Sequence, residues 1–303
     1  MKQYTLNGTY CFEGRGLHTG HFAHMCVKPA PENSGIVFKR VDFGEDALVE
    51  ALAENVSGTA RSTTLSKGEA SVGTVEHLLS ALTGLGVDNA LIEIDNAEVP
   101  ILDGSAKPYV EAILRDSLKE QAAERHYISL RETIEVTNPK SGSVIRIEPC
   151  GDTLYDATLD FRSQVMGLQH VVFNSSDNYA SQIAPCRTFV FFHELEQLID
   201  AGLIKGGDAD NAIVIVEHPV SEEQLAKMCA VFRQNGLHVR ENGYLDNLDL
   251  HFENECGRHK MLDLIGDLRL CGGFLKGKIT AFKPGHTINT NAAKAIREAL
   301  KTI

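Results

Sequence analysis

Three ionisable side chains, His259, Asp263 and Asp267, recur at intervals of four residues near the C-terminus. If residues 258–268 form a helix, these side chains project from one strip of its surface. The other positions are mostly apolar, and burying unpaired charges among them costs several kcal/mol or shifts their pKa values. A divalent cation is one partner that offsets this cost, since a His and an Asp four residues apart can both bind it. A surface helix with a solvated acidic stripe is the alternative, and both interpretations stay open on these residues alone.

A catalytic zinc ion needs three protein ligands and an open position for water. His259 and Asp263 supply two, and the best candidate for the third is His77, which begins a second predicted helix beside Glu76. If the fold is duplicated, the two helices can face each other across a shared interface. Glu76 would then lie beside the metal-bound water and act as a general base. The alternative is a Glu76 that only favours the helix dipole and a solvated His77.

His286 follows a predicted strand and a Pro-Gly turn, which can present a side chain to a cleft. Asp267 could hold His286 protonated, so that it stabilises a developing oxyanion or protonates a leaving group. Lys260 and Lys283 flank this region and would supply local positive charge. A solvated loop histidine and two ordinary surface lysines are the alternative.

Composition limits the class of protein. The chain has 303 residues, of which 43% are hydrophobic and 23% charged, as in ordinary soluble globular proteins. This length favours two domains. The formal net charge of -12 argues against a nucleic-acid partner, and an anionic small-molecule substrate would need a locally basic pocket.

The sequence also predicts a compartment. The first residues lack an apolar core of signal-peptide length, and no run is long enough to span a bilayer, so a cytoplasmic protein is expected. The seven cysteines are scattered, without a Cys-x-x-Cys pair, and are predicted to be reduced and mostly buried.

The order of predicted elements repeats along the chain. In the first half it predicts strands at 4–12, 21–27, 35–40 and 90–94, a small hairpin insert near 60–71, and helices at 75–82 and 108–124. In the second half it predicts strands at 128–136, 144–147, 154–161 and 278–282, and helices at 258–270 and 290–301. The chain is therefore predicted to be α+β, with a first domain at 1–126 and a similar second domain at 127–303.

Two segments interrupt the repeat in the second domain. Residues 190–216 are predicted to form a strand, a helix and a strand, which is a βαβ insertion. The insertion contains the pair Gly206-Gly207, which is only a weak signal for a phosphate-binding loop. Residues 217–255 form an extra connection, with a helix predicted at 221–234.

The ordered set of motifs resembles one family, UDP-3-O-acyl-N-acetylglucosamine deacetylase, the zinc amidase of bacterial lipid A synthesis. The matching stretches span nearly the whole chain and are Gly16-Leu17-His18-Thr19-Gly20, Thr74-Val75-Glu76-His77-Leu78, Glu98-Val99-Pro100-Ile101-Leu102-Asp103-Gly104-Ser105, Ala184-Pro185-Cys186-Arg187-Thr188-Phe189, Arg258-His259-Lys260 with Asp263 and Gly266-Asp267-Leu268, and Lys283-Pro284-Gly285-His286.

The resemblance implies a role for each matched residue. Zinc would be held by His77, His259 and Asp263, with Glu76 as general base. His286, supported by Asp267, would be the charged electrophilic or acid partner. Thr188 would help to polarise the acetamide carbonyl. The substrate-binding residues would be Lys260, Lys283, Phe161, Phe189 and Gly207, with Phe161 against the uracil.

The same resemblance implies the fold and the substrate. Each of two similar domains would have a small, mostly antiparallel sheet and two helices, and the helices would be sandwiched between the sheets. The substrate would be an acylated UDP-amino sugar, and the βαβ insertion would form an apolar passage for its fatty acyl chain. The apolar residues suited to this passage are Val190, Phe191, Phe192, Leu195, Leu198, Ile199, Leu203 and Ile204.

Two points leave alternatives open. Residues 219–242 form a longer connection than is usual in the family and contain no predicted catalytic residue. Some members carry a fused fatty-acyl dehydratase unit, so a fused or associated dehydratase is a possible partner. Besides deacetylation of the UDP sugar, a zinc amidase acting on another acylated amino sugar and a non-catalytic UDP-sugar or lipid-binding protein remain as alternatives.

Overall fold

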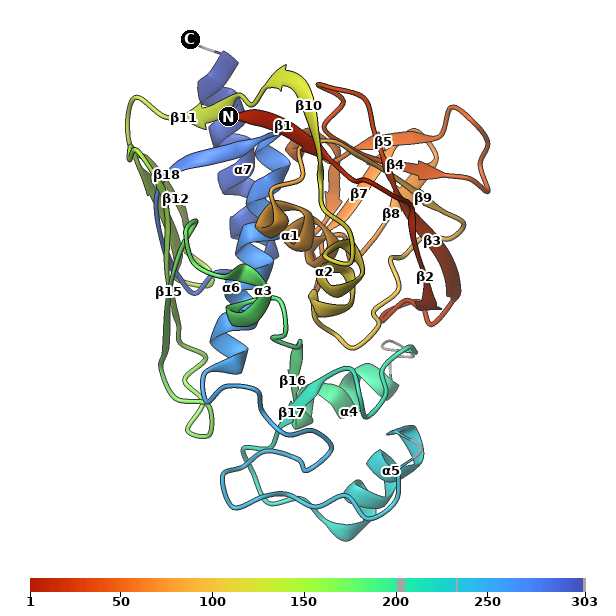
Figure 1. The fold of residues 1–303 in the computed structure, drawn as a ribbon. Helices are drawn as coiled ribbons and strands as arrows, with labels where there is room; N and C mark the ends of the chain where they lie inside the picture. Colours follow the sequence, from red (N-terminus) through yellow and green to blue (C-terminus); the bar gives the residue numbers. More distant parts are fainter. Residues whose placement is uncertain (201–204, 233, 302–303) are drawn as a thin grey trace.

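Two β-sheets enclose a layer of helices in the computed structural model, which describes residues 1–200, 205–232 and 234–301. Figure 1 shows the sheet of β2, β3, β9, β4 and β5 on one side, the sheet of β12, β15 and β18 on the other, and α1, α2, α6 and α7 between them. The α+β class and the sandwiched helices predicted from the sequence are confirmed.

The first half of the chain supplies one five-stranded sheet with the order β2-β3-β9-β4-β5. Only the β9–β4 pair is parallel. The strands of this half are β1 (Lys2–Thr5), β2 (Tyr10–Arg15), β3 (Phe22–Pro29), β4 (Ile36–Arg40), β5 (Leu48–Glu50), β6 (Val56–Gly58), β7 (Thr64–Lys67), β8 (Ala70–Val72), β9 (Ala90–Ile94) and β10 (Lys119–Glu124). Its helices are α1 (Glu76–Leu85) and α2 (Lys107–Ile113), with a 3₁₀ turn at Ala53–Asn55.

The second half repeats this arrangement in a sheet with the order β12-β13-β18-β14-β15, to which β11 adds beside β18. Its strands are β11 (Tyr127–Ser129), β12 (Ile134–Asn138), β13 (Ser143–Glu148), β14 (Thr153–Leu159), β15 (Gln169–Asn174) and β18 (Phe274–Phe282). Its main helices are α6 (Glu255–Leu268), which continues into a 3₁₀ turn at Arg269–Cys271, and α7 (His286–Lys301), with a short α3 (Tyr179–Gln182).

The two sheets have the same topology. In each set of five strands, the strand that comes last in the chain lies at the centre and pairs in parallel with the strand that comes third in the chain, β4 in one sheet and β14 in the other. This repetition confirms two similar units. The proposed limits of the domains, 1–126 and 127–303, stay a prediction.

Helices α1 and α6 are packed tightly against each other in the middle layer. Leu78 and Leu82 of α1 and Leu262 and Ile265 of α6 belong to the same buried core. A Cβ atom at position 266 would clash with the backbone oxygen of Glu76, so Gly266 permits the close approach of the two helices. The first turn of α1 is thereby held against the face of α6 that carries the acidic strip.

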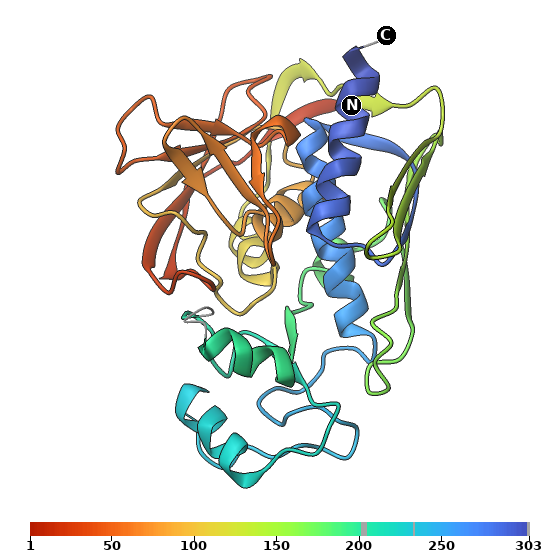
Figure 2. The same cartoon turned by 180° about the vertical axis from the view of Figure 1, so that it is seen from behind.

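The predicted βαβ insertion is confirmed. Strand β16 (Phe189–Phe191) pairs in parallel with β17 (Ile213–Ile215), and α4 (Phe192–Asp200) lies between them in the chain. Helix α5 (Glu222–Phe232) begins with a capping box, in which the Ser221 hydroxyl accepts the Gln224 N–H at 3.2 Å and the Gln224 amide oxygen accepts the Ser221 N–H at 2.9 Å. Both views place this unit apart from the two sheets (Figures 1 and 2).

Several predicted element boundaries were wrong. The helix predicted at 108–124 ends at Ile113, and 119–124 form β10, which pairs antiparallel with β1. The sequence Lys-Glu-Gln-Ala-Ala-Glu favours a helix locally, but pairing with a distant strand outweighs that preference. The strand predicted at 4–12 is two strands, and the last helix begins at His286 rather than at Thr290.

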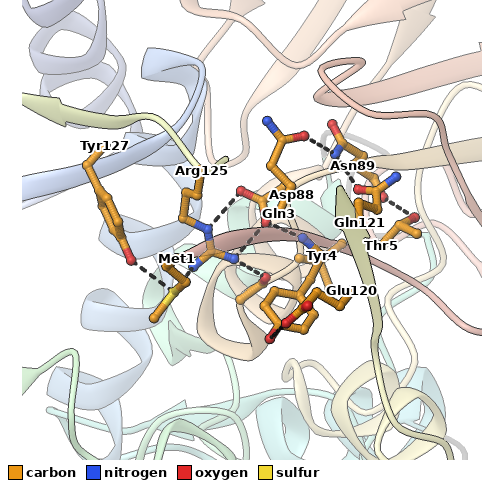
Figure 3. Close-up of polar contacts among 12 residues, drawn as sticks. Met1, Gln3, Tyr4, Thr5, Asp88, Asn89, Glu120, Gln121, Arg125 and Tyr127 are labelled. Carbon is orange, nitrogen blue, oxygen red and sulfur yellow. Dashed lines mark hydrogen bonds and ion pairs between the residues drawn. The ribbon is translucent and has the colours of Figure 1, made fainter. Parts of the chain in front are cut away.

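A network of polar contacts joins the end of α1 to the segment that leaves the first half (Figure 3). The Arg125 guanidinium donates to the Asp88 carboxylate at 2.9 and 2.6 Å and to the Gly86 backbone oxygen at 2.6 Å. Asp88 also accepts the backbone N–H of Tyr4 in β1 at 2.6 Å. These contacts hold the C-terminal end of α1 against β1 and the chain crossing into the second half.

One cysteine prediction was wrong. Cys11 and Cys26 form a disulfide between β2 and β3, where they are directly opposed in the antiparallel register, a relation that their separation in the sequence does not reveal. Of the remaining cysteines, Cys186, Cys256 and Cys271 are buried as predicted, while Cys150 is exposed. Within the described part of the chain, no helix is long and apolar enough to cross a bilayer.

Candidate metal centre and active site

The residues predicted as metal ligands converge from two helices. His77 lies in the first turn of α1, and His259 and Asp263 lie one turn apart on α6. The Nε2 atoms of His77 and His259 are 3.5 and 3.6 Å from Oδ1 of Asp263. One donor atom from each of the three residues lies within 4.8 Å of the other two, and all three side chains are buried. The acidic strip on α6 is therefore not a solvated surface.

The donor set suits a divalent cation. Oδ1 of Asp263 is buried and has no hydrogen-bond partner among the described residues, which is costly unless a cation binds it. Burial lowers the pKa of His259 to about 3, so its imidazole is neutral, as a ligand must be. Its Nδ1 lies 3.1 Å from the backbone oxygen of Cys186, which fixes Nδ1 as the donor and leaves Nε2 facing Asp263. Two imidazole nitrogens and a carboxylate oxygen are typical zinc ligands.

Lys260 pairs with the other oxygen of the same carboxylate. Its Nζ donates to Oδ2 of Asp263 at 2.8 Å. Burial alone would raise the pKa of Asp263, but the Lys260 ammonium is the largest influence that opposes this, and the pKa is held well below its usual range. Asp263 is therefore ionised, and its unpaired Oδ1 faces the two histidines.

A second charged group lies beside the candidate ligands. Nδ1 of His286 is 3.0 Å from Oδ2 of Asp267, and its Nε2 is 3.9 Å from Oε1 of Glu76. Burial alone would lower the pKa of His286, but the carboxylates of Asp267, Glu76 and Asp263 outweigh it and raise the pKa to about 9. Burial also raises the pKa of Glu76. The charges of His286 and His77 act in the opposite direction but offset only part of this rise. The sequence-predicted pair of Glu76 and His286 is therefore brought together, with Asp267 behind His286.

Two residues in this network escaped the sequence analysis. The Thr63 hydroxyl donates to Asp267 at 2.6 Å, and its backbone N–H donates to the Glu76 carboxylate at 3.0 Å. Asn289 donates to Oδ2 of Asp267 at 2.9 Å. Thr63 lay inside the predicted hairpin insert, where no signal indicated a role at the site. Asn289 lay just before the predicted start of the last helix. The true start of α7 places Asn289 one turn after His286 and is the signal that could have revealed Asn289.

Two buried glutamates explain two of the sequence motifs. Arg187 forms hydrogen bonds to Glu255 through its Nε at 2.9 Å and its Nη2 at 3.1 Å, and this fixes the segment whose Cys186 oxygen accepts from His259. Glu98 accepts hydrogen bonds from the backbone N–H groups of His18 and Thr19 and from the hydroxyl of Thr74 at 2.8 to 3.2 Å. Glu98 thus joins the glycine-flanked turn at 16–20 to the start of α1.

A cavity of about 660 Å³ opens beside His286. Its lining includes three of the predicted substrate-binding residues, Lys260, Lys283 and Phe161, together with Lys140 and Arg162. The Lys283 ammonium is 3.3 Å from Asp160, and Phe161 is an exposed aromatic ring at the rim. The basic pocket that an acidic protein needs for an anionic ligand is therefore present next to the candidate metal centre.

The remaining predicted residues, Thr188, Phe189 and Gly207, lie in the βαβ insertion or directly before it. The ring of Phe189 packs 5.6 Å from Phe161 and 6.3 Å from His259, so it forms part of the wall beside the metal centre. Thr188 and Gly207 line a different space, a small apolar recess against the insertion. Gly207 is not among the described residues that line the larger cavity.

The acyl passage predicted from the sequence is only partly described. Val190 and Leu195 line the recess, and Phe192 is buried in the adjoining cluster. Phe191 instead packs against Phe161 and Phe189. The other predicted members, the side chains of Leu198 and Ile199 and residues Leu203 and Ile204, lie outside the described residues.

Known proteins are similar to this chain over almost its full length. The chain is 44% identical over 301 residues to a protein of Porphyromonas gingivalis named "Bifunctional enzyme LpxC/FabZ", covering 99% of this chain and 65% of that protein. It is 36% identical to a UDP-3-O-acyl-N-acetylglucosamine deacetylase of Teredinibacter turnerae, covering 99% of this chain and 91% of the relative. It is 38% identical to a protein of the same name from Trichormus variabilis, covering 98% of each.

The extent of these matches differs between the two kinds of relative. The chain spans 65% of the length of the bifunctional proteins of Porphyromonas gingivalis and Bacteroides thetaiotaomicron and 64% of that of Chlorobaculum tepidum. The sequence profile described as LpxC, UDP-3-O-acyl N-acetylglycosamine deacetylase, matches residues 3–230 and 228–298, and the break falls inside the long connection after β17. On the matches that cover nearly the whole chain, the protein belongs to the UDP-3-O-acyl N-acetylglycosamine deacetylase family.

Proposed function

We propose that this protein is a zinc amidase that hydrolyses the N-acetyl group of UDP-3-O-acyl-N-acetylglucosamine, giving the free 2-amine and acetate in lipid A synthesis. One observation carries the proposal. The buried group of His77, His259 and Asp263 includes a carboxylate oxygen that has no hydrogen-bond partner among the described residues. It lies next to a carboxylate and a charged histidine, at the edge of a basic cavity. Membership of the deacetylase family supports the choice of reaction.

The candidate ligands have a defined task. Zinc held by His77, His259 and Asp263 would supply a Lewis acid for the amide carbonyl and lower the pKa of water at the site. The Lys260 ammonium keeps Asp263 ionised, and the Cys186 oxygen keeps the His259 ring oriented. The close packing of α1 on α6 holds the ligand of one helix against the two of the other.

Glu76 and His286 would move the protons. Glu76 is held by the Thr63 N–H, and its raised pKa suits a general base that takes a proton from the attacking water. His286 faces Glu76 in its charged form and would stabilise the negative charge that develops on the carbonyl oxygen, or protonate the departing amine. Thr188, which lines the adjoining recess, would help to polarise the same carbonyl.

The two spaces beside the centre fit the two ends of the substrate. The cavity lined by Lys260, Lys283 and Phe161 combines positive charge with an aromatic ring, which suits the diphosphate and uracil of a UDP sugar. The apolar recess against the βαβ insertion suits the acyl chain. Phe189 contributes to the wall between them.

Partners and location are inferred separately from the reaction. The relatives named "Bifunctional enzyme LpxC/FabZ" support a fused or associated fatty-acyl dehydratase as a partner. A cytoplasmic location stays a prediction, and the Cys11–Cys26 disulfide does not favour it, since disulfides are rare in reducing compartments.

Metal removal provides the direct test of the proposal. Acetate release from UDP-3-O-acyl-N-acetylglucosamine and bound zinc are measured on the same sample, before and after treatment with a chelator. Activity is expected to disappear with the metal and to return when zinc is added, because the three ligands have no other catalytic use. Full activity in a metal-free sample would show the proposal to be wrong. Zinc binding with release of acetate only from another acylated amino sugar, or with no hydrolysis at all, would favour one of the two alternative functions.

The pH profile is expected to report the charge on His286. This histidine is protonated below its pKa of about 9, so activity should fall as the pH rises through that value. A bound divalent cation adds positive charge nearby and moves the fall toward lower pH. The same raised pKa contributes stability that is present below the ordinary histidine pKa and lost as the pH rises through about 9. Profiles of kcat against pH for the parent and for His286→Gln test the expected fall in activity. The same fall at alkaline pH in both proteins would contradict the role of His286.

A further inference from the structure

A small apolar recess lies beside the candidate active site, on the side of the βαβ insertion. Its open volume is about 70 Å³. It is lined by Leu17, His18, Arg61, Thr188, Phe189, Val190, Leu195, Gly207, Asp208, Asn211, Ala212 and Phe232. Phe189 connects it to the metal centre, since this ring also packs 6.3 Å from the His259 ring.

The long connection between β17 and α6, which was predicted as residues 217–255 and ends before Glu255 in the structure, contributes one of these side chains. Phe232 is the last residue of α5, is buried, and lines the recess. The same cluster contains Met228, one turn earlier on α5, and Leu195 on α4. In Figures 1 and 2, α4 lies between α5 and the helices that carry the metal ligands. Helix α5, which ends at Phe232, therefore lies on the side of α4 remote from the helices of the metal centre.

The volume of the recess indicates what Phe232 does there. Sites that enclose a whole small ligand usually measure about 300–1,000 Å³, several times more than this recess. Its open space accommodates only a short apolar segment, and the buried Phe232 side chain forms part of its wall. A longer chain must displace that ring or leave its own end in water, and both reduce binding.

We propose that Phe232 of the long connection closes the outer end of the recess and sets the longest 3-O-acyl chain that the enzyme accepts. The inference rests on the proposed function, because it takes the apolar recess as the site of the acyl chain. It assigns a role to residues 217–255 that neither the catalytic chemistry nor the binding of the UDP sugar requires.

The test is a length series. The kcat/KM for acetate release is measured on UDP-3-O-acyl-N-acetylglucosamine substrates whose acyl chain grows in two-carbon steps, with the zinc-loaded parent and with Phe232→Ala. The parent is expected to lose efficiency beyond a limiting length. Phe232→Ala is expected to move that limit to longer chains and to gain about tenfold over the parent on the first chain that the parent rejects, since added methylenes in an apolar pocket discriminate by about that factor.

Met228→Ala is the matched control. It removes a buried side chain from the same helix and cluster, but Met228 does not line the recess, so the parental length limit should remain. Phe232→Trp keeps the site filled and is expected to shift the limit to shorter chains, which tests the proposal even if Phe232→Ala folds poorly. An unchanged limit in the folded Phe232 variants, or an equal shift in Met228→Ala, would overturn the proposal.

Failure of the proposed function has a different signature. A zinc-loaded parent that releases no acetate from any chain length contradicts the deacetylase assignment and leaves the recess to be tested by binding alone. Calorimetric titration with free fatty acids of increasing length then serves as the probe. Phe232→Ala is expected to bind longer fatty acids than the parent does, and equal length limits in the two proteins would overturn the inference on its own.

Discussion

Replacing Glu76 by Ala should lower kcat for acetate release by about 10²–10⁴-fold, the usual contribution of a general base, while leaving bound zinc unchanged. Glu76 lies 3.9 Å from His286 and outside the group of three metal-ligand candidates. Its removal therefore takes away the proton acceptor and keeps the metal ligands. Zinc content by atomic absorption and kcat by acetate release, measured on the same preparation, test both halves of the expectation.

A conservative variant separates proton transfer from positioning. Glu76→Gln retains an oxygen that can accept the Thr63 N–H, but the amide cannot take a proton at neutral pH. Glu76→Gln should therefore be nearly as inactive as Glu76→Ala, with the parental melting temperature. Parental kcat in Glu76→Gln would remove the base role, and loss of zinc in either variant would mean that Glu76 belongs to the metal site.

Replacing His259 by Ala should abolish both zinc binding and hydrolysis. His259 is buried, its Nε2 is 3.6 Å from the unpaired Oδ1 of Asp263, and its Nδ1 is held by the Cys186 oxygen. Loss of an outer partner of a ligand costs about 10–100-fold in metal affinity, so loss of the ligand itself should cost more. Titration with a competing zinc chelator measures the affinity, and circular dichroism shows whether the variant keeps the parental helix content.

A solvent-exposed histidine provides the control. The His24 side chain is 63% exposed and pairs with the surface carboxylates of Glu13 and Asp95, so His24→Ala should keep parental zinc affinity and activity. Stoichiometric zinc at parental affinity in His259→Ala would contradict the proposed ligand set and would leave the unpaired Asp263 oxygen without an explanation.

The elements that carry the ligands were predictable because their signals are local. The spacing of His259, Asp263 and Asp267 predicts one helical strip, and the structure contains that strip in α6, Glu255–Leu268. The position of Glu76 and His77 at the start of a helix also follows from neighbouring residues and is confirmed by α1. Periodicity and capping depend on residues a few positions apart, which a single sequence displays directly.

Features that depend on distant partners were missed or misplaced. Residues 119–124 have helix-favouring composition and form a strand only because β1 offers backbone partners. The disulfide between Cys11 and Cys26 follows from the β2–β3 register. Thr63 joins Asp267 across 204 residues of chain, and nothing near Thr63 in the sequence indicates that contact.

The sequence by itself determined the chemical inventory: two histidines and an aspartate suited to zinc, a carboxylate beside one of them, and a histidine preceded by a strand and a turn. It also determined the repeated order of strands and helices, because both follow from residue type and short-range spacing. Only the tertiary structure decided that the acidic strip on α6 is buried, that α1 meets it at Gly266, and that one Asp263 oxygen has no partner in the described chain. These features depend on how two helices pack across the middle layer, and packing is set by contacts between residues far apart in the chain.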